Sequence, residues 1–132
     1  MGIVRPVQPG ALIAAVTFAD EQSLCTAMER LTAVWGAVAF ASGEFAFDMT
    51  SYYAQEMGTS LRKRFHCFEP PLPPGSLPAA KLFSNGIEAE LARTADGVPA
   101  RTVNIDPGYV TLSKLVLATT KDYSHRIHIG QD

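Results

Sequence analysis

Apolar residues in the first part of the chain follow two spacings, each of which predicts a different element. Residues 11–19 are almost wholly apolar and lie between a glycine and an aspartate, which predicts a strand covered on both faces. In residues 21–35 the apolar side chains recur at steps of four, three and four, which predicts an amphipathic helix. We expect Asp20 to be the N-cap of this helix and Gly36 to end it.

Two segments in the middle of the chain alternate apolar and polar residues with a period of two, as strands do. Residues 37–48 follow this pattern on both sides of an interruption at Ser42 and Gly43, and residues 61–69 follow it without a break. The second strand has a basic face, made up of Arg62, Arg64, His66 and Phe68, opposite Leu61, Phe65 and Cys67. Residues 49–58 have no clean period, which predicts a loop or a single helical turn.

The second half of the pattern begins after a proline-rich stretch. Residues 69–78 predict a stiff surface connector, because prolines interrupt both helices and sheets. Apolar residues four apart in residues 78–93 predict a second amphipathic helix. Residues 94–99 are turn-like, and residues 101–106 predict a short strand that ends in an Asp-Pro-Gly turn at residues 106–108.

The predicted order of elements is strand, helix, strand, strand, helix, strand. This order is typical of the α+β class and of a ferredoxin-like βαββαβ fold, in which two helices cover one face of an antiparallel sheet. We expect a C-terminal helix or strand extension after it. Residues 111–120 fit both a helix and a buried strand, and we favour the helix. A chain of 132 residues is expected to form a single domain.

Composition narrows the class of protein. The chain has 47% hydrophobic and 18% charged residues, which is typical of a globular protein with a core. A net charge of -2 gives no broad basic field and argues against sequence-independent nucleic-acid binding. No apolar run reaches the ~18 residues that span a bilayer, so we expect a cytoplasmic protein without a membrane segment. Cys25 and Cys67 form no CxxC pair, and we expect two buried, reduced thiols.

Residues 103–126 hold the densest group of chemically capable side chains. They are Asn104, Asp106, Lys114, Lys121, His125 and Arg126. We expect Lys114, Lys121 and Arg126 to bind a small anion such as a phosphate or carboxylate, with Asn104 as a polar neighbour. In a helix, Lys114 and Lys121 would share one face.

Other functions stay open for this chain. Asp106 and His125 are candidate catalytic residues for proton transfer, with Glu56 as another candidate acid or base. The basic strand face would stack single-stranded bases if Tyr52 and Tyr53 lay beside it. The sequence contains no HExxH, CxxC or acidic calcium loop, and it predicts neither a metal site nor a cofactor. An alternative that involves neither a ligand site nor a reaction is a structural or interaction module that forms a homo-oligomer or binds a partner.

Six segments spread along the chain carry a family resemblance. They are SYYAQEMG at 51–58, RKRFHCFE at 62–69, the helix from Lys81 to Glu88, NIDPGY at 104–109, KLVLATTKD at 114–122 and HRI at 125–127. Together they resemble the prokaryotic family catalogued as domain of unknown function 4416, over residues 16–130. The resemblance implies no reaction, because the family has no established activity. It implies a longer chain, with a further strand and tail, so we expect residues 126–129 to form a final strand with an exposed edge.

Overall fold

The computed structural model describes residues 1–48 and 53–130. The helices are α1 (Glu21–Trp35), α2 (Ala54–Met57) and α3 (Leu77–Leu91), with the 3-10 turn η2 (Pro74–Ser76) before α3. The strands are β1 (Gly10–Phe18), β2 (Val38–Ala41), β3 (Phe45–Ala46), β4 (Arg62–Leu72), β5 (Arg93–Ala95), β6 (Val98–Ala100), β7 (Val103–Val110) and β8 (Leu115–Leu117). None of the described helices combines the length and the apolar character that crossing a bilayer requires.

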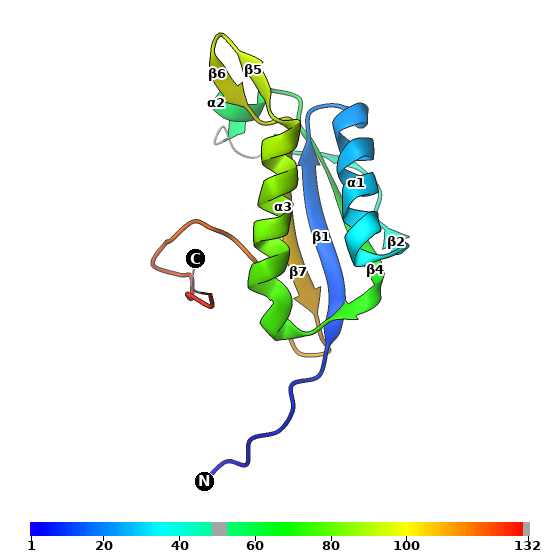
Figure 1. Ribbon diagram of the computed structural model, residues 1–132, viewed down its shortest axis with the longest axis vertical. Helices are drawn as coiled ribbons and strands as arrows, with labels where there is room; N and C mark the ends of the chain where they lie inside the picture. Colours follow the sequence, from blue (N-terminus) through cyan, green and yellow to red (C-terminus); the bar gives the residue numbers. More distant parts are fainter. Residues whose placement is uncertain (49–52, 131–132) are drawn as a thin grey trace.

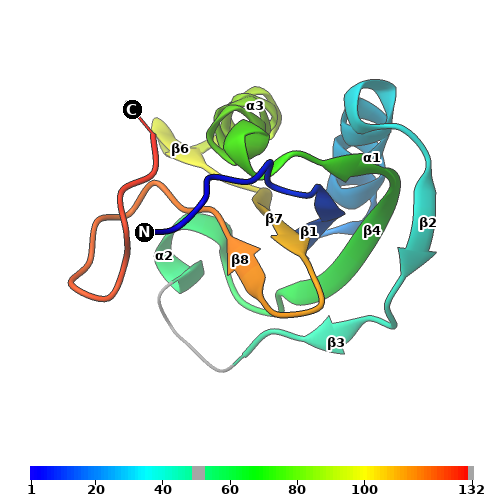
Figure 2. The same cartoon turned by 90° about the horizontal axis from the view of Figure 1, so that it is seen from below.

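The main sheet is antiparallel throughout the described residues, with β1 at its centre. Its strand order is β2-β4-β1-β7-β8, and β3 also pairs with β4. The strands β5 and β6 form a separate hairpin. Both long helices, α1 and α3, cover the same face of the sheet (Figures 1 and 2). The predicted mixed class with an antiparallel sheet is confirmed, and the ferredoxin-like assignment stays a prediction.

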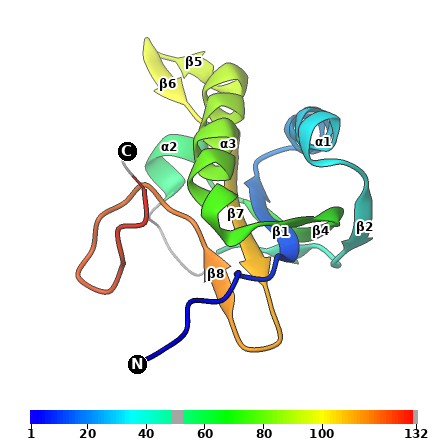
Figure 3. The ribbon, with the colours of Figure 1, turned by 60° about the horizontal axis from the view of Figure 1, so that its bottom comes forward.

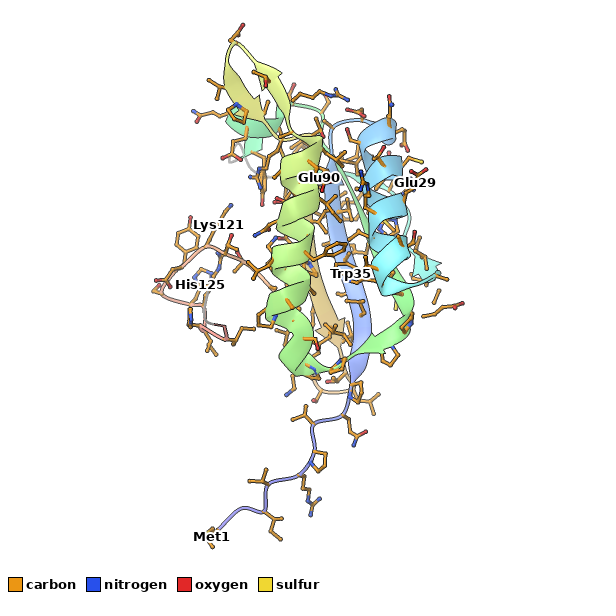
Figure 4. All side chains as sticks on the ribbon, in the orientation of Figure 1. Met1, Glu29, Trp35, Glu90, Lys121 and His125 are labelled. Atoms are coloured by element: carbon orange, nitrogen blue, oxygen red, sulfur yellow. The ribbon has the colours of Figure 1, made fainter. Side chains whose placement is uncertain are left out.

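The core lies between the sheet and the two long helices. Val16 and Phe18 are fully buried on the covered face of β1, because this central strand has neighbours on both sides. Trp35 is labelled on α1 in Figure 4. Its ring makes edge contacts with Phe68 and Phe83, at 5.3 and 5.8 Å between centroids. These aromatic contacts join α1 to both β4 and α3.

Both predicted ends of α1 are confirmed. The carboxylate of Asp20 accepts a hydrogen bond from the N–H of Ser23 at 2.8 Å, as an N-cap does. Burial opposes ionisation of Asp20, but its hydrogen bonds to Ser23 and the charge of Arg93 hold its pKa below the ordinary value. Gly36 ends the helix at a φ of 90°, and a Cβ there would lie 2.7 Å from Pro70.

The strand β4 continues through Pro70 and Pro71 to Leu72, so the predicted connector begins too early. β2 pairs with β4 only as far as Phe68, and no described strand continues along that edge. On its other side, Pro71 pairs with Ala11 next to a register shift. Prolines are tolerated at such places, because an edge or a bulge requires no ladder hydrogen bond from them.

The predicted basic face of β4 is the face that the helices cover, so it is not open to stack single-stranded bases, as one of the sequence hypotheses required. His66 and Phe68 are buried on this face. The guanidinium of Arg62 lies 4.9 Å from the centroid of the Phe18 ring and donates to Glu44 at 2.9 Å. Alternation in the sequence separates the two faces of a strand, but it does not show which face is covered. A long arginine side chain can cover an aromatic ring and still reach a carboxylate at the surface.

The helix favoured for residues 111–120 is wrong, because Leu115–Leu117 form the strand β8. β8 pairs with β7 in the register Gly108 to Leu117 and Val110 to Leu115. The outer edge of β7 carries backbone donors and acceptors that a paired strand satisfies and a helix does not. The sequence left open a strand for this apolar run, and the structure has a strand there.

Two other predictions are wrong, and a third is confirmed in part. Residues 106–108 lie inside β7 instead of forming a turn, because glycine at 108 allows close approach: a Cβ there would lie 2.3 Å from the Val116 carbonyl oxygen. The turn predicted within residues 94–99 is present at Asp96 and Gly97, which have positive φ, and the residues on either side of it form the hairpin β5–β6. Residues 126–129, expected as a final strand, have no regular structure.

Both cysteines are free, and neither is fully buried, which corrects the prediction of two buried thiols. Cys25 is exposed on α1, because its neighbours Leu24 and Ala27 carry the buried stripe of that helix. Cys67 is half-buried on β4. The two thiols therefore differ in their access to solvent.

The buried imidazole of His66 makes stability depend on pH. Its side chain is 5% exposed, and its Nδ1 has no hydrogen-bond partner in the described part of the chain. Burial, and secondarily the charge of Arg64, lowers the pKa of His66 from 6.5 to about 4. Between these two pH values the unfolded chain binds a proton that the folded chain does not. The free energy of unfolding is therefore highest above pH 6.5 and falls as the pH is lowered toward 4.

We predict that lowering the pH from 7 to 5 costs wild type about 2 kcal/mol more unfolding free energy than the His66→Leu variant. Urea denaturation at the two pH values measures this difference. The exposed His128 provides the control, and His128→Leu should keep the pH dependence of wild type. An equal pH dependence in wild type and His66→Leu would show that His66 is not buried as a neutral base.

Candidate functional site

The outer edge of β7 is held by charged side chains of α3. Among the described strands, β8 pairs only with the last three residues of β7, so the edge at Ile105 faces the helix. The N–H of Ile105 donates to Glu88 Oε1 at 2.7 Å, and the Ile105 carbonyl accepts from Lys81 Nζ at 2.7 Å. The hydroxyl of Ser84 also donates to this carbonyl, at 3.3 Å. Side chains of a helix thus replace the strand that is missing at this edge.

Lys81 and Glu88 belong to a buried network of charges. Their side chains are 8% and 7% exposed, and Lys81 Nζ lies 3.7 Å from Glu88 Oε1 and 3.2 Å from Asp106 Oδ1. The second oxygen of Glu88 accepts from Arg101 Nη1 at 3.1 Å. Asn104 donates to Asp106 at 3.0 Å and accepts from Arg101 at 3.2 Å. The network therefore fixes the orientation of Asn104 and Asp106 from both sides.

Arg101 joins this network to α2 through Glu56. Its Nε donates to Glu56 Oε2 at 2.9 Å, and its Nη2 forms a second, short contact with the same oxygen. Burial opposes the charge of Arg101, but hydrogen bonds to Glu56 and Glu88 raise its pKa above the ordinary value. Glu56, a candidate acid or base in the sequence, therefore serves here as an ion-pair partner.

A cleft with a volume of about 260 Å³ opens beside this network. Its walls come from α3, from β7 and from the segment that follows β8, which passes beside α3 (Figures 1 and 3). The lining residues are Tyr53, Lys81, Asn85, Glu88, Arg101, Asn104, Asp106, Leu117, Ala118, Thr119, Thr120, Lys121 and Arg126. Four of these side chains are cationic and two are acidic, so the cleft suits a ligand with negative charge.

Arg126 is fixed in the wall of the cleft by one end of its guanidinium. Its Nη1 donates to Thr119 Oγ1 at 3.1 Å and to the carbonyl of Lys121 at 2.9 Å, and its guanidinium carbon lies 4.6 Å from the centroid of the Tyr123 ring. Nε and Nη2 of Arg126 donate to no protein atom within residues 1–48 and 53–130. The Nζ of Lys121 lies 5.2 Å from the centroid of the Tyr53 ring. The guanidinium is thus held in place, with one donor edge that the described residues leave unused.

The structure brings together four of the six residues that the sequence proposes as a site. Asn104, Asp106, Lys121 and Arg126 all line the cleft. Lys114 does not, because it lies exposed in the turn between β7 and β8 and not on a helix. The predicted helical face shared by Lys114 and Lys121 is therefore wrong.

His125 also lies outside the cleft lining. Its imidazole is exposed and stacks on the ring of Tyr123, at 6.0 Å between centroids. Figure 4 labels His125 and Lys121 on the segment beside α3. Asp106 is instead engaged by Lys81 and Asn104, so the two residues proposed for proton transfer have separate partners.

Sequence reasoning missed Lys81, Glu88 and Arg101 as site residues. Their partners on β7 lie 24 and 17 residues away from Lys81 and Glu88, and no local pattern encodes such distances. One signal was present in the sequence. Lys81, Ser84 and Glu88 recur at steps of three and four and form a polar stripe within an otherwise amphipathic helix. Among the described residues no three His, Cys, Asp or Glu side chains converge to hold a metal ion.

Comparison with known proteins identifies the family. The model of the family described as "Domain of unknown function (DUF4416)" matches residues 8–132. The chain therefore belongs to this family, and the resemblance seen in its segments is confirmed. No curated protein and no solved structure gives a significant match.

Removing the Glu88 carboxylate should leave the buried N–H of Ile105 without its partner, and it should take one of two carboxylate partners from the buried Lys81 and from the half-buried Arg101. We predict that Glu88→Ala lowers the free energy of unfolding by about 3–5 kcal/mol, as measured by guanidinium denaturation. Glu90 on the same helix is the matched control, because it forms only a surface ion pair with Arg30 at 3.6 Å. Glu90→Ala should cost less than about 1 kcal/mol. Similar small losses in both variants would contradict the role given to Glu88.

Proposed function

We propose that this protein binds a small ligand through a phosphate or carboxylate group in the cleft beside α3. The observation that carries this proposal is the guanidinium of Arg126, which is fixed through Nη1 while Nε and Nη2 remain unused by the described chain. The Nε–Nη2 edge presents two parallel N–H donors, a geometry that matches two oxygens of an oxyanion.

The surroundings of Arg126 support an anionic ligand. Lys121 contributes a second positive charge to the same wall, and the hydroxyl-bearing residues Thr119 and Thr120 line it. Lys81 and Arg101 add positive charge from deeper in the cleft, although Glu88, Asp106 and Glu56 offset it. Because the deeper cations already have carboxylate partners, the ligand would be recognised by the C-terminal segment and positioned by the buried network.

The size of the cleft limits the ligand. Its volume of about 260 Å³ lies just below the range of roughly 300–1,000 Å³ typical of small-molecule sites. The ligand is therefore expected to be a small phosphorylated or carboxylated molecule rather than a polymer. Asn85 and Asn104 would offer its uncharged part amide groups for hydrogen bonding.

We propose binding and no reaction, because the groups suggested for proton transfer do not meet. Asp106 accepts hydrogen bonds from Lys81 and Asn104 inside the network. His125 stacks on Tyr123 outside the cleft lining. General acid–base catalysis by Asp106 and His125 acting together would require both side chains within hydrogen-bond reach of the same substrate.

Replacing Arg126 should weaken anion binding without affecting the fold. Charge-assisted hydrogen bonds contribute ~1.5–3 kcal/mol, so we predict that Arg126→Ala weakens binding by about 10- to 100-fold. The assay is isothermal titration with inorganic phosphate and with a panel of small phosphate esters and dicarboxylates. Lys114→Ala is the matched control, because it removes a positive charge from the neighbouring turn outside the cleft.

The outcomes separate a site from a general charge effect. Loss in Arg126→Ala with unchanged binding in Lys114→Ala supports the site. Equal loss in both variants would mean that anions respond only to overall charge, and this result contradicts the proposal. Binding of no compound in the panel by wild type also contradicts it.

A further inference from the structure

The face of the sheet opposite the long helices carries exposed apolar side chains in two clusters, one on β2, β3 and β4 and the other on β7 and β8, with β1 between them. We call the two clusters together the open face, and its members are Phe40, Phe45, Phe65, Val110, Leu115 and Leu117. Their exposed fractions lie between 36% and 67%. This exposure is unusual for six large apolar side chains on one face of a sheet.

The strand register assigns these residues to one face. His66 and Phe68 are buried on the helix-covered face, so Phe65 between them points the other way. Phe45 pairs with Lys63 on this second face and stacks on Phe65, at 6.0 Å between centroids.

The strands β7 and β8, on the other half of the sheet, follow the same alternation between the two faces. Tyr109 and Val116 pair with each other and pack against the core, so their neighbours point away from it. Val110 pairs with Leu115 on the open face, and Leu117 pairs there with Gly108. The open face therefore has members on both sides of β1, from β2 and β3 to β8.

Only part of this side of the sheet is covered. Of the described helices, only the short α2 lies on it (Figure 2). The end of the sheet near α2 is covered, as the burial of Thr17 and Asn104 shows. The open face occupies the rest, and its exposed fractions correspond to an apolar area on the order of 500 Å².

We propose that the open face binds the open face of a second copy of this chain. A stable interface buries roughly 800 Å² per partner, with an apolar centre and a polar rim. An apolar centre of the order of 500 Å² fits this requirement and lies near the upper end of the patches found on monomers. Packing of the two sheets face to face would give four layers, with the helices outside and both sheets inside.

The distribution of side chains favours a second copy over a different partner. The aromatic members Phe40, Phe45 and Phe65 lie on one half of the open face, and the aliphatic members lie on the other half. A two-fold axis parallel to the strands places the aromatic half of each copy on the aliphatic half of the other. The six members carry no charge, unlike a surface for nucleic acid, and a net charge of -2 per chain gives little repulsion between copies.

Two native cysteines allow the proposal to be tested in the unmodified chain. Cys67 lies on the same side of the sheet as Phe65 and pairs with Ile13, whereas Cys25 is exposed on α1, outside the proposed interface. Alkylation rates are measured by mass spectrometry from low micromolar to submillimolar chain concentration, alongside sedimentation velocity. We expect a dimer at the higher concentrations and at least tenfold slower alkylation of Cys67, with the rate at Cys25 unchanged.

Surface variants distinguish specific dimerisation through the open face from non-specific association of exposed apolar residues. Phe40→Asp and Leu115→Asp change the most exposed member of each half, and both should remain folded and become monomeric. Val34→Asp is the matched control, because Val34 is an exposed apolar residue on α1, and this variant should stay dimeric. Cooperative thermal melts establish that each variant is folded.

Three results would overturn the proposal. One is a wild-type chain that stays monomeric over the whole concentration range. Another is a dimer that persists in both Phe40→Asp and Leu115→Asp. The third is a Cys67 alkylation rate that does not depend on chain concentration.

Discussion

The contact between the backbone of Ile105 and two charged side chains of α3, Lys81 and Glu88, determines how α3 is held against the edge of β7. Within residues 1–48 and 53–130 no strand pairs with the outer edge of β7 at this residue, since β8 pairs only with the end of β7. Glu88 accepts from the Ile105 N–H and Lys81 donates to its carbonyl, so α3 is bound to the sheet edge by directional bonds in addition to apolar packing. An unpaired N–H or C=O in this buried position would be costly.

The same charges that hold the edge of β7 also form the inner wall of the cleft. Burying Lys81 and Glu88 is costly, and a hydrophobic pair would hold the helix at a smaller cost in desolvation. In return, these charges orient other groups of the site: Asp106 accepts from Lys81, and Arg101 bridges Glu88 to Asn104. The proposed ligand site therefore has a rigid inner wall on regular elements and an outer wall on the segment that carries Arg126.

Local signals in the sequence predicted local structure well. The apolar run of β1, the N-cap Asp20 and the stop at Gly36 each depend on neighbouring residues, and the structure confirms all three. The sequence also grouped Asn104, Asp106, Lys121 and Arg126, because they belong to a single stretch, residues 103–126, that is rich in chemically capable side chains. The strand β8 and the partners Lys81 and Glu88 could not be predicted in this way. Both depend on where the edge of β7 lies in space, and residues far away in the sequence determine that position.

We propose that Arg126 binds an anion in the cleft through the donor edge that the described residues leave unused. The most direct measurement is an NMR titration that follows the Nε–H signals of the arginines while inorganic phosphate is added at constant ionic strength. We expect the Arg126 signal to shift and to saturate as phosphate is added. The signal of Arg62, which is already paired with Glu21 and Glu44, should not move. An Arg126 signal that does not shift would contradict anion binding by Arg126. Shifts of equal size at all exposed arginines, without saturation, would contradict it as well.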